Sequence, residues 1–175
     1  MKAVVFTESS NTVDENAQSL LNYYKGQFRP VASLVEELSN FADTDLYILS
    51  DEFGVSQASQ SISGLTPGSD RAQVHEHAQS LLLKEVEDAD IIILLLTKSV
   101  FTEILKPIWS DLIKKSTEDS IWGLAVPQSV LDELDLNSLR TKGTLYIYPR
   151  VGVARIDTET RTSILDAVEA RTNSN

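Results

Sequence analysis

The sequence of 175 residues contains no cysteine and only two histidines. Without cysteine, the chain has no thiol nucleophile, no disulfide framework and no thiolate zinc site. The histidines, His75 and His77, lie in one predicted helix, where positions two apart point about 200° away from each other and cannot bind one metal ion together. No dense cluster of carboxylates occurs elsewhere in the sequence. The sequence therefore predicts no metal centre, and it argues against a serine–histidine–aspartate hydrolase.

Glycine-rich nucleotide motifs and long apolar segments are also missing. Neither G-x-x-x-x-G-K-[ST] nor G-x-G-x-x-G occurs, which argues against a P-loop and against a standard dinucleotide site. The apolar start gives way at once to Thr7 and Glu8, and it is shorter than the core of a signal peptide. No stretch approaches the roughly 20 apolar residues of a membrane span. We therefore expect a cytoplasmic protein with no membrane partner.

Negative charge predominates in the composition. The chain has 15 lysines and arginines against 26 aspartates and glutamates, for a formal net charge of −11. A surface of this sign repels phosphate, which argues against non-specific nucleic-acid binding by the whole surface. It suits docking to a basic protein partner, and it is compatible with a halophilic source.

Short apolar segments alternate with segments of helical period. The continuous apolar runs predict buried strands of a parallel sheet, and the alternation predicts an α/β fold with three layers, a mostly parallel sheet of about five strands and helices on its faces. We expect a single domain over residues 1–170, a frayed polar tail over 171–175, and a long loop over 55–69. The predicted strands are residues 2–6, 45–49, 90–96, 121–126 and 144–148. The predicted helices are 13–24, 30–41, 70–86, 99–115 with a kink or break at Pro107, a short one near Val130, and a last one capped by Asp157.

Ligand sites of such sheets lie outside the carboxyl ends of the strands. This rule selects residues 7–11, 50–54, 97–99 and 148–153. After the first strand, Thr7, Glu8, Ser9 and Ser10 form a hydroxyl-rich turn with one carboxylate. This turn suits a small polar ligand, with Glu8 as acid or base. The same residues also suit a simple connection whose hydroxyls cap the next helix.

The turn after the second strand carries two adjacent carboxylates, Asp51 and Glu52. Gly54 suits a positive φ in a tight turn, and Phe53 suits either a stacking platform or a plug for the core. The long, serine-rich loop over residues 55–69 follows. A loop of this length is typical of a lid or binding loop, although a disordered connection without function explains it equally well.

Three segments together resemble a known family. They are residues 17–28, which contain Tyr24-x-x-x-Phe28, residues 46–55, which contain Leu49-Ser50-x-x-Phe53-Gly54, and residues 88–96. Their order and spacing resemble the small α/β domains grouped with peroxide-stress proteins and uracil-DNA-glycosylase-like folds, over roughly residues 1–110. The resemblance implies that Tyr24, Phe28, Ser50 and Gly54 form a pocket. The chain departs from the family in lacking a cysteine and a lysine in the first turn and in carrying Asp51 and Glu52 after the serine.

Three functions remain open at this point. The leading hypothesis is a nucleobase- or nucleotide-directed domain of the glycosylase-like class, acting in nucleic-acid modification or defence, in which a carboxylate orients water, Phe53 stacks on the base and no cofactor is required. The alternatives are a non-catalytic binding or regulatory subunit, and a flavodoxin-like cofactor binder whose phosphate turn is residues 7–12. The predicted catalytic residues are Glu8, Asp51 and Glu52, and the predicted ligand-binding residues are Thr7, Ser9, Ser10, Tyr24, Phe28, Ser50, Phe53, Gly54 and Thr97.

Overall fold

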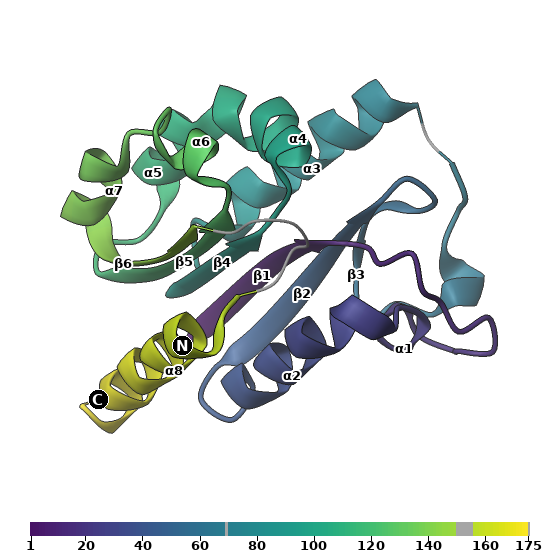
Figure 1. Ribbon diagram of the computed structural model, residues 1–175, viewed down its shortest axis with the longest axis horizontal. Helices are drawn as coiled ribbons and strands as arrows, with labels where there is room; N and C mark the ends of the chain where they lie inside the picture. The colour runs from purple at the N-terminus through teal and green to yellow at the C-terminus, as the bar shows by residue number, and fades with distance from the viewer. Residues whose placement is uncertain (69, 150–155, 175) are drawn as a thin grey trace.

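A six-stranded sheet runs through the described residues, 1–68, 70–149 and 156–174, of the computed structural model (Figure 1). Its strand order is β3-β2-β1-β4-β5-β6, and all neighbouring pairs are parallel except β2 and β3. The predicted α/β class with a mostly parallel sheet is therefore confirmed. The strands are β1 (Lys2–Glu8), β2 (Asp43–Ser50), β3 (Gly54–Gln57), β4 (Ile91–Leu95), β5 (Ser120–Val126) and β6 (Gly143–Pro149).

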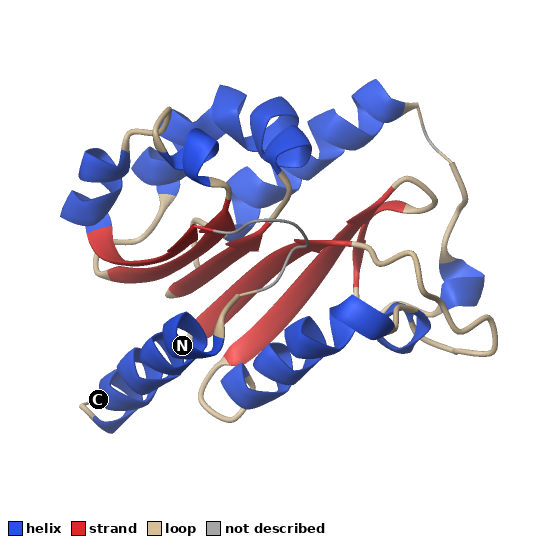
Figure 2. Cartoon of the chain, in the orientation of Figure 1, coloured by secondary structure: helices blue, strands red, loops and turns tan. Residues whose placement is uncertain are grey.

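Helices cover both faces of the sheet and complete three layers (Figure 2). One face carries α1 (Leu20–Tyr23), α2 (Arg29–Leu38) and α8 (Thr158–Asn173). The other carries α3 (Arg71–Glu85), α4 (Lys98–Val100), α5 (Trp109–Lys115), α6 (Gln128–Leu131) and α7 (Leu136–Lys142). Short 3-10 turns occupy Gly26–Phe28, Ile62–Gly64 and Lys106–Ile108, and a π-helical turn occupies Phe101–Leu105.

The core lies on both sides of the sheet, which explains the continuous apolar strands. In β4, Ile92 and Leu94 pack under α3 and α5, whereas Ile91 and Ile93 pack on the face of α2 and α8. All four are fully buried. In β5, Gly123 allows α8 to approach closely, because a Cβ there would lie 2.8 Å from Ile164 Cδ1. Two-sided burial thus requires apolar residues at every position of the inner strands.

Two predicted segments differ from the structure. The loop expected over residues 55–69 begins with the edge strand β3, because Gly54 at φ +67° makes a tight turn that returns the chain antiparallel to β2. The helix expected over 13–24 is reduced to α1. Val13, before this helix, pairs with Tyr24, directly after it, in an isolated bridge. Asp14 Oδ1 accepts a hydrogen bond from the backbone N–H of Asn16. Local side-chain bonds of this kind favour turns over helix.

The remaining helices follow the sequence closely. The run over 99–115 is helical and is interrupted at Lys106–Ile108, where Pro107 lies. Asp157 caps α8 by accepting a hydrogen bond from Thr160 N at 3.3 Å. The helix α8 then continues through Asn173, past the point where a frayed tail was expected. Helix α7 was not predicted; Asp135 caps it by accepting from Ser138 N.

Candidate functional site

The strand order places a crevice at the end of β1. From β1 the chain crosses through α2 to β2 on one side, and from β2 through α3 to β4 on the other side of β1. One crossover therefore leads to one side of β1 and the next leads to its other side. Where the strand order reverses in this way, a crevice opens at the carboxyl ends of the strands, and ligands of α/β sheets bind there. Leaving out the antiparallel edge β3, the order of the parallel strands is 2-1-3-4-5, which is the flavodoxin-like order.

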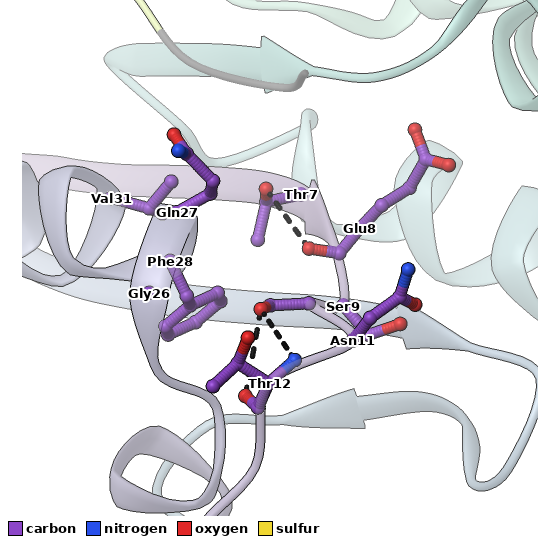
Figure 3. Close-up of a pocket in the computed structure, with 10 residues that line it drawn as sticks. Thr7, Glu8, Ser9, Asn11, Thr12, Gly26, Gln27, Phe28 and Val31 are labelled. Carbon is purple, nitrogen blue, oxygen red and sulfur yellow. Dashed lines mark hydrogen bonds between the residues drawn. The ribbon is translucent and has the colours of Figure 1, made fainter.

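A cavity of about 340 Å³ lies at this position (Figure 3). Its walls come from the turn after β1 and from the segment that begins α2. Thr7, Phe28 and Val31 are buried, so they form the closed end of the cavity. The ten lining residues are Thr7, Glu8, Ser9, Ser10, Asn11, Thr12, Gly26, Gln27, Phe28 and Val31.

Hydrogen bonds tie the two walls together. Ser10 Oγ donates to the carbonyl of Lys25 at 2.8 Å and accepts from the backbone N–H of Thr12 at 3.2 Å. Lys25 N donates to the carbonyl of Thr12 at 2.8 Å. Gly26 lies at φ +61°, where a Cβ would meet the Thr12 side chain at 3.4 Å. The turn after β1 is therefore held against the start of α2, and these hydrogen bonds fix the position of its backbone at the cavity wall.

Helix α2 begins at the wall of the cavity. Arg29 is its first residue, Pro30 occupies the second position, and Phe28 and Val31 on either side both line the cavity. Proline suits the first turn because its missing N–H has no helical partner there. The N-terminus of a helix carries a partial positive charge of about half an elementary charge. This end of the cavity therefore favours an anionic group.

The carboxylate of Glu8 is turned away from the hydroxyl group of Ser9 and from Thr12 (Figure 3). Its Oε1 accepts a hydrogen bond from Thr97 Oγ1 at 2.9 Å, and its Oε2 accepts one from the backbone N–H of Thr97. Glu8 is half-buried. It thereby links the end of β1 to the residues that follow β4, and it leaves the Ser9–Thr12 side of the cavity without an inward carboxylate.

The residues of the second turn lie apart from this cavity. Ser50 Oγ accepts from the backbone N–H of Phe53 at 2.9 Å, and Glu52 accepts from the Tyr23 hydroxyl at 3.4 Å. Asp51 is exposed and lines a separate hollow of about 110 Å³ together with Arg71. Phe53 and Gly54 line a third cavity of about 440 Å³. The three predicted catalytic carboxylates are thus not gathered around one cavity.

A row of aromatic rings connects the first and third cavities. Phe28 lies 5.6 Å from Tyr24, Tyr24 lies 5.1 Å from Tyr23, and Tyr23 lies 6.0 Å from Phe53, measured between ring centroids. Tyr24 is 4% exposed. Burial raises the pKa of its hydroxyl, and hydrogen bonding with the nearby Ser50 and Ser9 hydroxyls opposes that shift.

Of the predicted site residues, the structure brings Thr7, Glu8, Ser9, Ser10 and Phe28 to one cavity. Residues 150–153 of the last selected segment lie outside the described residues. Of the other lining residues, Asn11 belongs to the segment 7–11 that the strand-end rule selects, and Thr12 belongs to the turn 7–12 of the flavodoxin-like alternative. Sequence reasoning missed Gly26, Gln27 and Val31, although Pro30 gave a signal for the neighbouring helix start.

No group of three or more histidines and carboxylates in the described ranges is placed to hold a metal ion. No helix in those ranges combines the length and apolar character that crossing a bilayer requires.

Comparisons with known proteins give no information about this site. No protein-family model, curated protein or solved structure matches the chain. The resemblance to glycosylase-like domains therefore remains a hypothesis that rests on the residues alone.

Proposed function

We propose that this domain binds a small phosphate-bearing ligand of the nucleotide class at the carboxyl end of β1. The observation that carries the proposal is the position of the 340 Å³ cavity, between the hydroxyl-rich turn after β1 and the N-terminus of α2. Helix N-termini and hydroxyl or backbone N–H donors are among the groups that proteins use to bind phosphate without a metal.

The chemistry of the walls favours an acceptor-rich ligand. The hydroxyls of Ser9 and Thr12 and the amides of Asn11 and Gln27 supply hydrogen-bond donors. Glu8, the carboxylate among the ten lining residues, accepts hydrogen bonds from Thr97. Its carboxylate points away from Ser9 and Thr12 (Figure 3). A phosphate offers several acceptor oxygens and a negative charge, and both suit a donor-lined cavity at a helix N-terminus.

The size and surroundings favour a mononucleotide over a flavin. A volume of about 340 Å³ is at the small end of ligand cavities, which typically span about 300–1,000 Å³. A flavin ring gains stability by stacking on aromatic side chains. The segment after β4, from Thr97 to Val100, and the segment after β5, Pro127 and Gln128, contain no aromatic residue for such stacking.

The same geometry favours binding over glycosidic cleavage. Hydrolysis would require a carboxylate free to orient a water molecule against the sugar. Glu8 accepts from both the N–H and the hydroxyl of Thr97, which holds its carboxylate away from the Ser9–Thr12 side of the cavity. Asp51 lines a different hollow. We therefore propose a binding module and not a hydrolase.

Isothermal titration calorimetry with adenosine 5′-monophosphate, adenosine and inorganic phosphate tests this function. The informative variant is Thr12→Glu, which adds a negative charge to the cavity wall. Its matched control is Thr162→Glu, which adds the same charge on the exposed surface of α8. We expect adenosine 5′-monophosphate to bind wild type and the control alike, and to bind Thr12→Glu about tenfold or more weakly.

Two results would contradict the proposal. The first is a folded wild-type protein that binds none of the three compounds, which would direct attention to a basic protein partner. The second is equal loss of affinity in Thr12→Glu and Thr162→Glu, because this would show an effect of overall charge and not of the cavity.

A further inference from the structure

The edge strand β3 turns the backbone groups of alternate residues away from the sheet. In an antiparallel pair, successive residues direct their N–H and C=O groups alternately toward the partner strand and away from it. Ala58 N donates to the Leu46 carbonyl at 2.8 Å, so Ser56, two residues earlier in the same register, also faces β2. Val55 and Gln57 therefore direct their backbone groups outward.

The chain itself pairs the outward groups of Gln57 but not those of Val55. Gln57 N donates to Gln60 Oε1 at 3.0 Å, and Gln60 N donates to the Gln57 carbonyl at 3.0 Å. No hydrogen bond to another described residue uses the N–H or the C=O of Val55. Unpaired backbone groups at a sheet edge form a template for pairing with a further strand.

The third cavity, of about 440 Å³, lies along this edge. Residues 53–56 line it in succession. Because side chains of successive strand residues point to opposite faces, such a run of lining residues places the cavity beside the strand and not on one face of the sheet. The chain passes from the turn at Ile62–Gly64 to α3 on the outer side of β3 (Figure 1). The opposite walls are residues 64–66 of this segment and Gln73, Val74 and His77 of α3.

The walls of this cavity are uncharged, whereas its surroundings are acidic. Among the described residues that line it there is no aspartate, glutamate, lysine or arginine. Asp51 and Glu52, both exposed, directly precede the lining run, and exposed Asp70 directly precedes α3. Arg71, the first residue of α3, is paired with Glu103 at 2.7 Å. These charges favour a partner with an uncharged centre and basic flanks.

We infer that the β3 edge binds an extended peptide segment of a partner protein, which adds a strand to the sheet and carries an apolar residue between basic ones. The apolar residue pairs with the N–H and C=O of Val55, and its side chain shares the face of the Val55 side chain. Val74 lines the cavity beside that position. This site is separate from the nucleotide cavity, and it makes the long loop after β3 the outer wall of a binding site.

A labelled peptide tests the backbone pairing without any change to the protein. The probe is fluorescein-labelled Lys-Lys-Thr-Val-Thr-Lys-Lys-amide, measured by fluorescence anisotropy with the full chain. We expect saturable binding with a dissociation constant of about 100 µM or lower. N-methylation of the central valine removes the N–H that donates to the Val55 carbonyl and should weaken binding about tenfold or more. N-methylation of either adjacent threonine, whose N–H points away from β3, has the same charge and should change the affinity less than about twofold.

Two variants and one exchange measurement locate the peptide on the protein. Gly64→Trp fills the cavity, and the chain tolerates a side chain there because a Cβ meets nothing within 4 Å. Ser59→Trp places the same ring on an exposed turn outside the cavity. We expect Gly64→Trp to weaken peptide binding about tenfold and Ser59→Trp to leave it unchanged. Hydrogen exchange measured by NMR should slow about tenfold or more at the Val55 amide when peptide binds, and stay unchanged at Ser56, which already faces β2.

Three results would overturn the inference. The first is a folded wild-type protein that does not bind the peptide. The second is equal loss of affinity on methylation of valine and threonine, or in Gly64→Trp and Ser59→Trp, because attraction by overall charge explains both. The third is a wild-type dimer in light scattering that Gly64→Trp dissociates, because a second copy of the chain then occupies the edge. Calorimetry with adenosine 5′-monophosphate tests the proposed function separately, so either idea can fail without the other.

Discussion

Glu8, the last residue of β1, accepts hydrogen bonds from both the hydroxyl and the backbone N–H of Thr97, the second residue after the end of β4. The two residues are 89 positions apart in the chain. Their contact lies between β1 and β4, where the strand order reverses. The Glu8 carboxylate therefore closes part of the crevice in which ligands of such sheets bind. This contact decides which side of Glu8 remains open to a ligand.

Removing the charge of Glu8 is expected to strengthen phosphate binding. In Glu8→Gln the amide oxygen still accepts one bond from Thr97, while the negative charge beside the cavity is lost. We expect affinity for adenosine 5′-monophosphate to rise about threefold and the free energy of unfolding to fall by about 1–2 kcal/mol. Calorimetry and urea denaturation measure the two effects. Asp51→Asn removes the same charge outside the cavity and should leave the affinity unchanged; an equal rise in both variants would contradict the assignment.

The pairing of β5 with β6 depends on the absence of a side chain at Gly143. A Cβ there would lie 1.9 Å from the backbone oxygen of Ser120, its partner in the register. We expect Gly143→Ala to lower the free energy of unfolding by at least about 2 kcal/mol, because the two strand backbones must separate. Gly64→Ala is the control, since a Cβ at that position meets nothing within 4 Å. Urea denaturation that finds both variants equally stable would show that the strands are farther apart in solution.

The indole of Trp122 relies on one hydroxyl in the core. Trp122 Nε1 donates to Ser120 Oγ at 2.9 Å, and both residues are fully buried. Ser120→Ala should therefore lower the free energy of unfolding by about 1–3 kcal/mol, because the indole N–H loses its partner. In a double-mutant cycle, Trp122→Phe should cost about 1 kcal/mol less in the Ser120→Ala background than in wild type. Additive effects in denaturation experiments would mean that the bond contributes nothing.

Stability at alkaline pH is expected to depend on Tyr47. Burial raises the pKa of its hydroxyl to about 12 from a usual 10.0, and the charge of Glu85 adds to the shift. The folded state thus holds the proton more tightly than the unfolded state, so this contribution is complete below pH 10 and is lost as the pH rises toward 12. Tyr47→Phe keeps the stacked ring on Phe6 and should reduce the loss over that window by about 2 kcal/mol. Denaturation at a series of pH values, with Tyr146→Phe as control, measures it; parallel curves for all three proteins would contradict the prediction.

The inner strands were predictable because burial on both faces leaves a local signature. Ile91, Ile92 and Ile93 are apolar in succession, and that pattern requires no knowledge of their partners. The edge strand β3 has no such signature. Val55 is the one large apolar residue within Gly-Val-Ser-Gln, and the strand exists because Gly54 turns the chain back along β2.

The cavity was predictable only in part, for a related reason. Thr7, Ser9 and Ser10 follow a recognisable strand, so the rule for carboxyl ends selects them. Gln27 and Val31 line the cavity because the start of α2 lies beside the end of β1. That position depends on the path of the chain from β1 to β2, and the residues around Gln27 and Val31 do not reveal it. Tyr24 gives no local sign that its hydroxyl is buried, because that depends on packing against Phe28 and on the neighbouring serines.

The central place of β1 also bears on how the chain folds as it is synthesised. Strand β1 pairs with residues 43–49 on one side and 91–95 on the other, so during synthesis its hydrogen bonds are complete only after residue 95 has been made. Ile164 and Val168 of α8, which cover part of the same face, arrive later still. Such long-range parallel pairings form slowly and leave apolar surface exposed to other chains in the meantime. The nascent protein therefore exposes apolar surface over an extended interval, during which its net charge of −11 keeps separate chains apart by repulsion.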